Sequence, residues 1–431
     1  ASPPLPRALI LPRAALARPG GGAWGEPRPA RGPAPAGGRA RSSREHAPDA
    51  RAQARAAVAM DPAEDWLVDS LRLYRDFHAF GLPGATRVLE WAGDTGVFVA
   101  GYGSPGKNEI LHLTPPLRLS AKENQGLFPE RDFKVCHGGF SDRPVFDLKH
   151  VPDTRLLVTS GLPGPYLQVW QFGEDSDVVR AASTIAVPEE AEGLWPRLAI
   201  FPGAAPAVLH GARLSGLRIV DLQSQKTTFT SGTGDSEALS SLQALDADSF
   251  AFCCASGRLG LVDTRRQWAP SECRRPSAAQ GAGGGQWCAE VGGQGSGPHV
   301  ASLCSDGQLR LHDPRDLCHP MSTVQCLVPV PSPKPELLRV TWAPSLDSCL
   351  AVSGFDGTIQ VYDVSSWGGA GSQAEPLFTH KGHIFLDGYG LGAAPLVTTH
   401  TWHPQRPRTL LSAASDASLH VWDWVGPAAS C

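Results

Sequence analysis

The chain has 431 residues, of which 42% are hydrophobic, so it is long enough to bury a large core. Its formal net charge of -4 is unevenly distributed, because residues 1–59 hold ten arginines and only three acidic residues. The remainder is therefore strongly acidic, which argues against a general nucleic-acid-binding protein.

Residues 1–59 consist mainly of Ala, Arg, Pro and Gly. This composition offers little apolar surface for a core, so we expect a disordered extension. An Arg-rich, acid-poor leader also resembles a mitochondrial transit peptide, but the repeated Pro and Gly would interrupt the amphipathic helix that such a peptide needs. The first methionine is Met60, and we expect the ordered protein to begin there.

A short helix is predicted at the start of residues 60–85. Asp61 can cap it, Pro62 suits its first turn, and Glu64 can reach back to the cap amide. Apolar residues then recur at three- and four-residue intervals until Gly81 and Pro83: Trp66, Leu67, Leu71, Tyr74, Phe77 and Phe80. We expect a helix packed on the rim of the main domain. Two alternatives are a partner-binding helix that presents Trp66, and a C-terminal part that straightens into a strand.

A spacing of twenty residues recurs along the rest of the chain. In four places an aromatic, aliphatic or histidine residue stands two positions before a proline. Twenty positions after that residue, a strand-like run ends. The pairs are His150 and Trp170, Ile200 and Val220, Trp342 and Tyr362, and Trp402 and Trp422. Repeated units of this size, each holding several short strands, predict a β-propeller.

Seven blade-sized units follow one another within residues 86–425, and residues 426–431 form a short tail. Each unit contains three strand-like runs, and Asp306-Gly307 and Asp356-Gly357 are predicted to form two-residue hairpins with positive φ angles. Fourth strands are poorly marked. The expected cores are 86–113, 145–172, 194–222, 239–263, 286–313, 337–363 and 396–424. Since the C-terminus ends shortly after Trp424, closure of the ring needs an added strand, for which the segment between Leu71 and Trp91 is the candidate.

Three linkers, 114–144, 264–285 and 365–395, are longer than a simple turn. The second contains a basic cluster around Trp268, whose composition suits a phosphate or a tubulin tail. A solvated loop is the plainer interpretation of this segment. The cluster consists of Arg265, Arg266, Arg274 and Arg275.

The sixth and seventh units resemble the WD-repeat family. The resemblance lies in Trp342-Ala-Pro344, Val361-Tyr362-Asp363, Trp402-His-Pro404 and Trp422-Asp423. In that family a Gly-His pair, a Ser or Thr, a turn Asp and a strand Trp form a hydrogen-bonded chain within a blade. The matching residues are Gly382-His383, Ser412, Asp416 and Trp422. The resemblance thus implies a structural role for them, in an all-β, seven-bladed propeller with a short N-terminal helix.

From Met60 onward, the Asp-Trp-Leu-Val-Asp-Ser-Leu helix and the Gly382-His383-Ile-Phe-Leu-Asp-Gly stretch resemble one branch of this family. That resemblance implies a non-enzymatic cytoplasmic scaffold that assists assembly of the RNA-endonuclease module of the Integrator complex. It also implies an alternative role at spindle microtubules, with tubulin or spindle components as partners, at the spindle pole and the cleavage furrow. We expect a monomeric ring with no direct nucleic-acid partner and no membrane insertion.

Sequence motifs that would indicate catalysis, nucleotide binding or metal binding are weak. Residues Gly101–Lys107 nearly complete a phosphate-binding loop, but Asn108 follows where Ser or Thr is needed, and a short strand follows where a helix is needed. The pairs His380-x-x-His383 and His400-x-x-His403 have spacings that zinc could use, although structural histidines are the simpler interpretation. We therefore predict no catalytic, cofactor or metal site; the alternative class is an enzyme with a metal site in the propeller channel.

The ten cysteines form no Cys-x-x-Cys pair, so the usual spacings of zinc ribbons and redox sites are absent. No apolar run is long enough to span a bilayer, and arginines and prolines interrupt the first apolar residues before a secretory signal can form. These features favour a reduced, intracellular setting.

Overall fold

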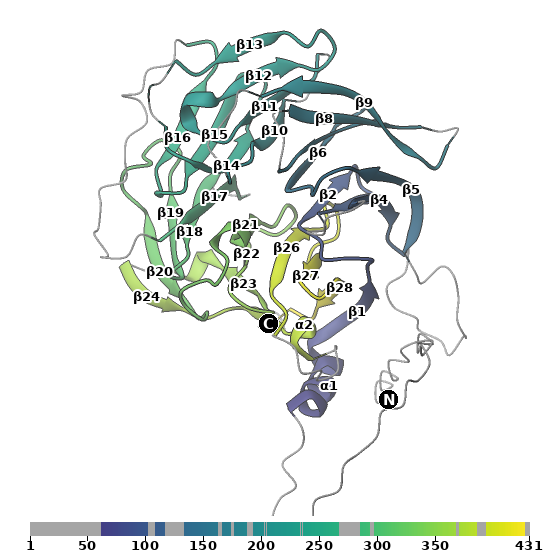
Figure 1. Cartoon of the computed structure of the whole chain (residues 1–431). Helices are drawn as coiled ribbons and strands as arrows, with labels where there is room; N and C mark the ends of the chain where they lie inside the picture. The colour runs from purple at the N-terminus through teal and green to yellow at the C-terminus, as the bar shows by residue number, and fades with distance from the viewer. Residues whose placement is uncertain are drawn as a thin grey trace, which may run out of the picture. The chain divides into compact units, whose positions relative to one another are not determined.

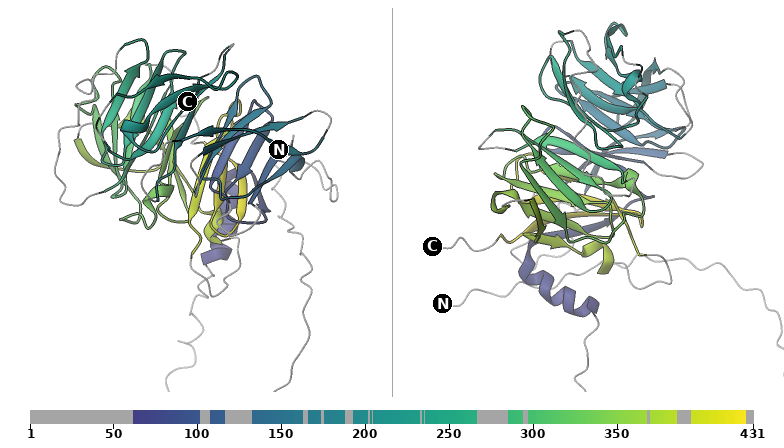
Figure 2. Two further views of the ribbon diagram at one scale, coloured as in Figure 1. Left: turned by 45° about the horizontal axis from the view of Figure 1, so that its top comes forward. Right: turned by 90° about the vertical axis from the view of Figure 1, so that its left-hand side faces the viewer.

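A computed structural model describes residues 62–101, 108–116, 133–162, 166–173, 176–187, 193–201, 203, 205–232, 234, 236–266, 285–293, 297–367, 370–385 and 394–426. The chain divides into two compact units, residues 1–71 and residues 72–431. The second unit is a seven-bladed β-propeller, as the sequence predicted, with one sheet per blade arranged around a central axis (Figures 1 and 2). None of the described helices is long and apolar enough to cross a membrane.

Blades 1 to 3 each contain four antiparallel strands, and blade 4 contains three among the described residues. Blade 1 comprises β2 (Val88–Ala92), β3 (Gly96–Ala100), β4 (Asn108–Thr114) and β5 (Lys134–Ser141). Blade 2 comprises β6 (Asp147–Val151), β7 (Leu156–Ser160), β8 (Tyr166–Phe172) and β9 (Val179–Ala186). Blade 3 comprises β10 (Arg197–Phe201), β11 (Ala207–Gly211), β12 (Arg218–Asp221) and β13 (Thr227–Thr230). Blade 4 comprises β14 (Leu239–Ala244), β15 (Ser249–Cys254) and β16 (Leu259–Asp263).

Blade 5 is extended to five strands, and blades 6 and 7 have four each. Blade 5 comprises β17 (Trp287–Gly292), β18 (His299–Cys304), β19 (Gln308–His312), β20 (Ser322–Cys326) and β24 (Ala370–Ala374). Blade 6 comprises β21 (Arg339–Trp342), β22 (Cys349–Ser353), β23 (Ile359–Asp363) and β25 (Phe378–His380). Blade 7 comprises β26 (Val397–Trp402), β27 (Thr409–Ala414), β28 (Ser418–Trp424) and β1 (Tyr74–Gly81). The helices are α1 (Pro62–Leu73), α2 (Gly382–Phe385) and the 3-10 turns Leu214–Gly216, Pro335–Leu337 and Val364–Ser366.

The twenty-residue spacing has a direct structural cause. In blade 7, Trp402 on β26 and Trp422 on β28 both pair with Leu410 on the strand between them. The two landmark residues therefore lie abreast across the sheet, separated by one strand. The same arrangement occurs in the other three blades: His150, Leu157 and Trp170; Ile200, Val208 and Val220; Trp342, Leu350 and Tyr362.

The ring is closed by β1, which lies between Leu71 and Trp91 in the sequence. It pairs antiparallel with β28, from Tyr74 opposite Trp424 to Gly81 opposite Ser418. The apolar periodicity through Phe80 had predicted one longer helix, and that expectation was wrong beyond Leu73; the alternative, in which the C-terminal part straightens into a strand, is what the structure shows. Pairing with the edge of β28 gives the backbone N–H and C=O groups of this segment hydrogen-bond partners, and it gives Tyr74 and Phe77 aromatic neighbours. This tertiary contact therefore overrides the local helical pattern.

A second connection joins blades 5 and 6. Strand β24 leaves the linker that follows β23 of blade 6 and pairs in parallel with β20 of blade 5. Its Ala374 is buried in the apolar cluster that blades 5 and 6 share. The linker between the sixth and seventh cores therefore covers the outer edge of the fifth blade.

Apolar side chains between neighbouring blades form the core. Between blades 7 and 1, for example, Leu411 and Val421 pack with Leu89 and Val99, and all four are buried. Similar clusters lie between other neighbouring blades. Each flat sheet thus buries both of its faces.

The prediction of two-residue hairpins at Asp306-Gly307 and Asp356-Gly357 was wrong in the length of both connections. Three residues separate β18 from β19, and five separate β22 from β23. Gly307 has the expected positive φ of 82°, whereas in the second turn Gly354, and not Gly357, has a positive φ. The Asp356 carboxylate organises that turn, because it accepts bonds from the Thr358 amide at 2.8 Å and the Thr358 hydroxyl at 2.6 Å.

Candidate functional site

The polar network of blade 7 is centred on His383, at the second residue of α2. Its Nε2 lies 2.9 Å from Ser412 Oγ on β27, and the indole Nε1–H of Trp422 on β28 donates to the same hydroxyl at 3.2 Å. These three residues expose 1% or less of their surface. The structure therefore brings together three of the four residues that the family resemblance assigned to the network.

Ser418 lies between the histidine and Asp416. Its hydroxyl is 2.7 Å from His383 Nδ1 and donates to the Asp416 carboxylate at 2.7 Å. One set of hydrogen positions satisfies every group: Trp422 Nε1–H donates to Ser412, Ser412 to His383 Nε2, His383 Nδ1–H to Ser418, and Ser418 to Asp416. The chain of donors runs from the buried indole to an exposed carboxylate, with His383 in its neutral form.

Two further histidines, one of them from the first histidine pair of the sequence analysis, extend this region. His380 on β25 lies 2.7 Å from the Tyr74 hydroxyl through Nδ1, and 3.1 Å from His420 Nδ1 through Nε2. Burial lowers the pKa of His380, His383 and His420 well below 6.5 and raises that of Tyr74. His380 belongs to the His380-x-x-His383 pair of the sequence analysis, whereas His420 was not singled out there. The contact with Tyr74 could not have been predicted, since Tyr74 is more than 300 residues away in the sequence.

These three histidines are the group among the described residues whose side chains could hold a metal ion, with their nitrogen atoms within 4.8 Å of one another. Their geometry does not suit a metal. The rings of His383 and His420 stack at 3.7 Å with an interplanar angle of 2°, so a metal cannot lie in the plane of both. Both nitrogens of His383 already contact serine hydroxyls. Zinc needs in-plane lone pairs about 2.1 Å away, and the arrangement serves hydrogen bonding instead.

The second histidine pair of the sequence analysis is engaged elsewhere. His400 lies 2.7 Å from both the Thr341 and the Ser353 hydroxyl, so it ties blade 7 to blade 6. His403 Nδ1 accepts the amides of Gln405 and Arg406 at 3.1 Å and so organises the turn after β26.

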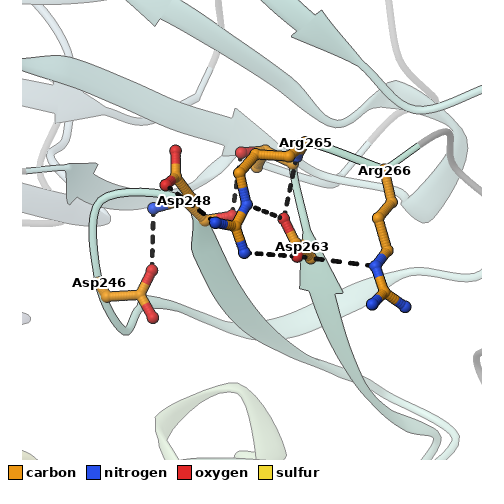
Figure 3. Close-up of polar contacts among 6 residues, drawn as sticks. Asp246, Asp248, Asp263, Arg265 and Arg266 are labelled. Carbon is orange, nitrogen blue, oxygen red and sulfur yellow. Dashed lines mark hydrogen bonds and ion pairs between the residues drawn. The ribbon is translucent and has the colours of Figure 1, made fainter.

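The basic cluster predicted as a partner contact is partly neutralised (Figure 3). Arg265 donates two bonds to the Asp263 carboxylate at 2.9 Å and lies 3.8 Å from Asp248. Arg266 approaches Asp263 at 3.8 Å. With Asp246 in the neighbouring turn, three carboxylates surround two guanidinium groups, so this part of the loop is not a free positive patch. Arg274 and Arg275 lie outside the described residues.

Two other candidates from the sequence can be placed only in part. Trp66 lies in α1 and exposes 6% of its surface, which fits a packed side chain better than an exposed contact. The glycine-rich stretch lies outside the described residues from position 102 to position 107, and β4 follows it as the predicted short strand.

Sequence comparisons identify relatives that match nearly their whole length. The chain is 73% identical over 374 residues to the human "Integrator complex assembly factor WDR73", covering 85% of this chain and 98% of that protein. The Xenopus laevis protein of the same name is 44% identical over 362 residues, covering 83% and 97%. A yeast "Histone-binding protein MSI1" is 30% identical over 129 residues, covering 30% of this chain and 25% of that protein. No protein-family model matches the chain.

Proposed function

The chain belongs to the WDR73 family of Integrator complex assembly factors, and from this premise we propose that it is a protein-interaction scaffold that assists assembly of the Integrator complex. The observation that carries the proposal is the 73% identity to a human relative with that name over 98% of its length. Identity of this extent preserves the propeller fold, and loops mounted on a rigid ring commonly hold its partner contacts.

At a finer level, we propose that the scaffold acts in the cytoplasm on subunits of the RNA-endonuclease module. The rigid ring supports this role, because strand β1 and the β24 connection fix neighbouring blades in place. A preformed surface loses little conformational entropy when a partner binds.

The test is capture of partners by the tagged full-length chain, followed by identification of the bound proteins. We expect Integrator endonuclease-module subunits to be recovered, and assembly of that module to decrease when the protein is depleted and to return with the wild-type chain. A complete absence of Integrator subunits, with normal assembly after depletion, would contradict the proposal. Fractionation of the same cells tests the cytoplasmic location.

The spindle role is a second proposal, and the basic loop is the feature that bears on it. The contacts of Arg265 and Arg266 with Asp263 weaken the case for a tubulin-tail contact. Salt-dependent pelleting with microtubules that is lost when Arg265, Arg266, Arg274 and Arg275 are changed to Ala would support it. Recovery of Integrator subunits by the same variant, without tubulin, would favour the assembly role.

We also propose that the protein acts without catalysis. The stacked geometry of His383 and His420 supports this, because the strongest candidate for a metal centre is poorly shaped for one. Elemental analysis of the purified protein provides the check, since one zinc per chain that is lost in a His420→Asn variant would contradict a purely structural network.

A further inference from the structure

A polar cavity of about 350 Å³ is lined by residues on or beside the innermost strands of all seven blades. These strands are β2, β6, β10, β14, β17, β21 and β26, which surround the central axis in Figure 1. It adjoins a second cavity of about 370 Å³, and the two share Arg87, Trp195 and Arg197 in their walls. We call the first of them the axial cavity. Four basic and four acidic side chains line it.

Three arginines from three different blades reach the axial cavity: Arg87 before β2, Arg197 on β10 and Arg339 on β21. The Arg87 guanidinium lies over the rings of Phe146 and Trp195, at 4.1 and 5.3 Å, and the Arg197 guanidinium lies over Trp195 at 4.5 Å. Neither of these two guanidinium groups has a hydrogen bond or ion pair with any residue that the structure describes. Each retains five N–H donors for another acceptor.

The third arginine is only partly satisfied. Arg339 donates one bond, at 3.3 Å, to the backbone carbonyl of His400. The positive charges also repel one another: after burial, which is the main cause, Arg87 and Arg339 further lower the pKa of Arg197. Asp147 opposes this shift, but it does not pair directly with Arg197.

Three of the four carboxylates that line the cavity have other partners, and the fourth, Glu336, partly offsets by its charge the lowering of the Arg87 pKa that burial causes. Glu90 pairs with Lys149 at 2.9 Å, and Asp147 accepts the Leu198 amide at 2.9 Å. Glu290 accepts the Trp342 amide at 2.6 Å, and burial raises its pKa to about 7, so it is partly neutral near physiological pH. The hydrogen bonds of Glu90, Asp147 and Glu290 are therefore directed at lysine and the backbone, and the guanidinium groups of Arg87 and Arg197 keep N–H donors without an acceptor among the described residues.

We propose that the axial cavity binds a small multivalent oxyanion, whose oxygens accept hydrogen bonds from the guanidinium groups of Arg87, Arg197 and Arg339. Guanidinium groups match phosphate and carboxylate oxygens bidentately, and a partly dehydrated cavity strengthens such bonds. The volume is in the range of small-ligand sites. Because the arginines come from three blades, the site suits an anion with charges at several positions.

The experiment is calorimetric titration of the full-length protein with sodium tripolyphosphate at pH 7 and constant ionic strength. A parallel titration with citrate distinguishes a polyphosphate from a polycarboxylate as the preferred oxyanion. We expect about one anion to bind per chain. Arg197→Gln and Arg339→Gln should each weaken the binding about tenfold or more, because each removes charge-assisted hydrogen bonds.

The matched control is Arg180→Gln, on the exposed outer strand β9, which should bind as the wild type does. Circular dichroism establishes that each variant is folded. The two cavity variants change residues on different blades, so the result does not depend on a single substitution. The proposal is overturned if the wild type binds neither anion, or if Arg180→Gln weakens binding as much as the cavity variants do. It is also overturned if a glutamate-rich peptide binds while both small anions fail, which would assign the cavity to an acidic protein segment.

Discussion

Replacing Ser412 by Ala tests whether the blade 7 network stabilises the propeller. The hydroxyl of Ser412 serves both His383 Nε2, at 2.9 Å, and Trp422 Nε1, at 3.2 Å, and all three residues are almost completely buried. Alanine preserves the backbone and removes one oxygen atom. It leaves a buried indole N–H and a buried imidazole nitrogen without their partner.

Leaving a buried polar group unsatisfied costs about 1–3 kcal/mol. Two groups lose a partner, the His383 imidazole and the Trp422 indole, and the bond from the indole is long at 3.2 Å. We therefore expect the free energy of unfolding to fall by roughly 3 kcal/mol. That is a large part of the ~5–15 kcal/mol that separates folded from unfolded domains. Ser418→Ala should cost less, since Ser418 is only partly buried and water can replace its hydroxyl.

The assay is urea-induced unfolding followed by tryptophan fluorescence. The matched control is Ser224→Ala, in the exposed turn between β12 and β13, where a change within about 0.5 kcal/mol is expected. If Ser412→Ala unfolds at the same urea concentration as the control, or if Ser418→Ala is the more damaging variant, the directional hydrogen-bond chain is wrong.

Three further predictions concern stability. Tyr74→Phe removes the hydroxyl that contacts His380 and should lower the free energy of unfolding by about 1–2 kcal/mol in the same assay; an unchanged value would mean that this contact contributes nothing. Gly161→Ala should cost about 1–3 kcal/mol, because its Cβ would lie 1.9 Å from the Pro144 carbonyl oxygen, whereas Gly232→Ala meets no atom within 4 Å and should be tolerated; equal unfolding midpoints would contradict this. Acid should destabilise the ring below pH 6.5, because the unfolded chain protonates histidines that burial keeps neutral in the folded state. Each such histidine contributes about 1.4 kcal/mol per pH unit, so a stability that stays flat from pH 7.5 to 5.5 would refute the argument. These histidines include His380, His383 and His420, and burial also lowers the pKa of His112, His210, His312, His400 and His403.

The blades could be predicted from sequence because their pairing is local. Trp402 and Trp422 share a partner, Leu410, within two successive hairpins, so the geometry of the sheet appears as a fixed spacing along the chain. The outer strands lack such a signal. Strand β5, at the outer edge of blade 1, has no regular alternation of buried and exposed residues, so the pattern that marks a strand in the sequence is missing there.

Contacts between distant segments could be predicted only in part: the short chain after Trp424 indicates closure by the segment between Leu71 and Trp91, but not its register or its side-chain contacts. The run from Trp66 to Phe80 has apolar residues at helical intervals, and only the exposed edge of β28 explains why its second half is a strand. The same limit applies to the site. His383, Ser412 and Trp422 follow from a motif, whereas Tyr74 joins His380 only after the ring has closed, and β24 reaches β20 from another blade.

The pairing of β1 with β28 also constrains how the protein is made. Tyr74 is synthesised 350 positions before its partner Trp424, so at ~5–20 residues per second the ribosome needs about 20–70 s to supply the second strand. During that interval β1 has an unpaired edge, which is open to chaperones or to aggregation. The blade that is begun first is completed last, and a premature stop codon before Ser418 would deprive β1 and β27 of the strand they share.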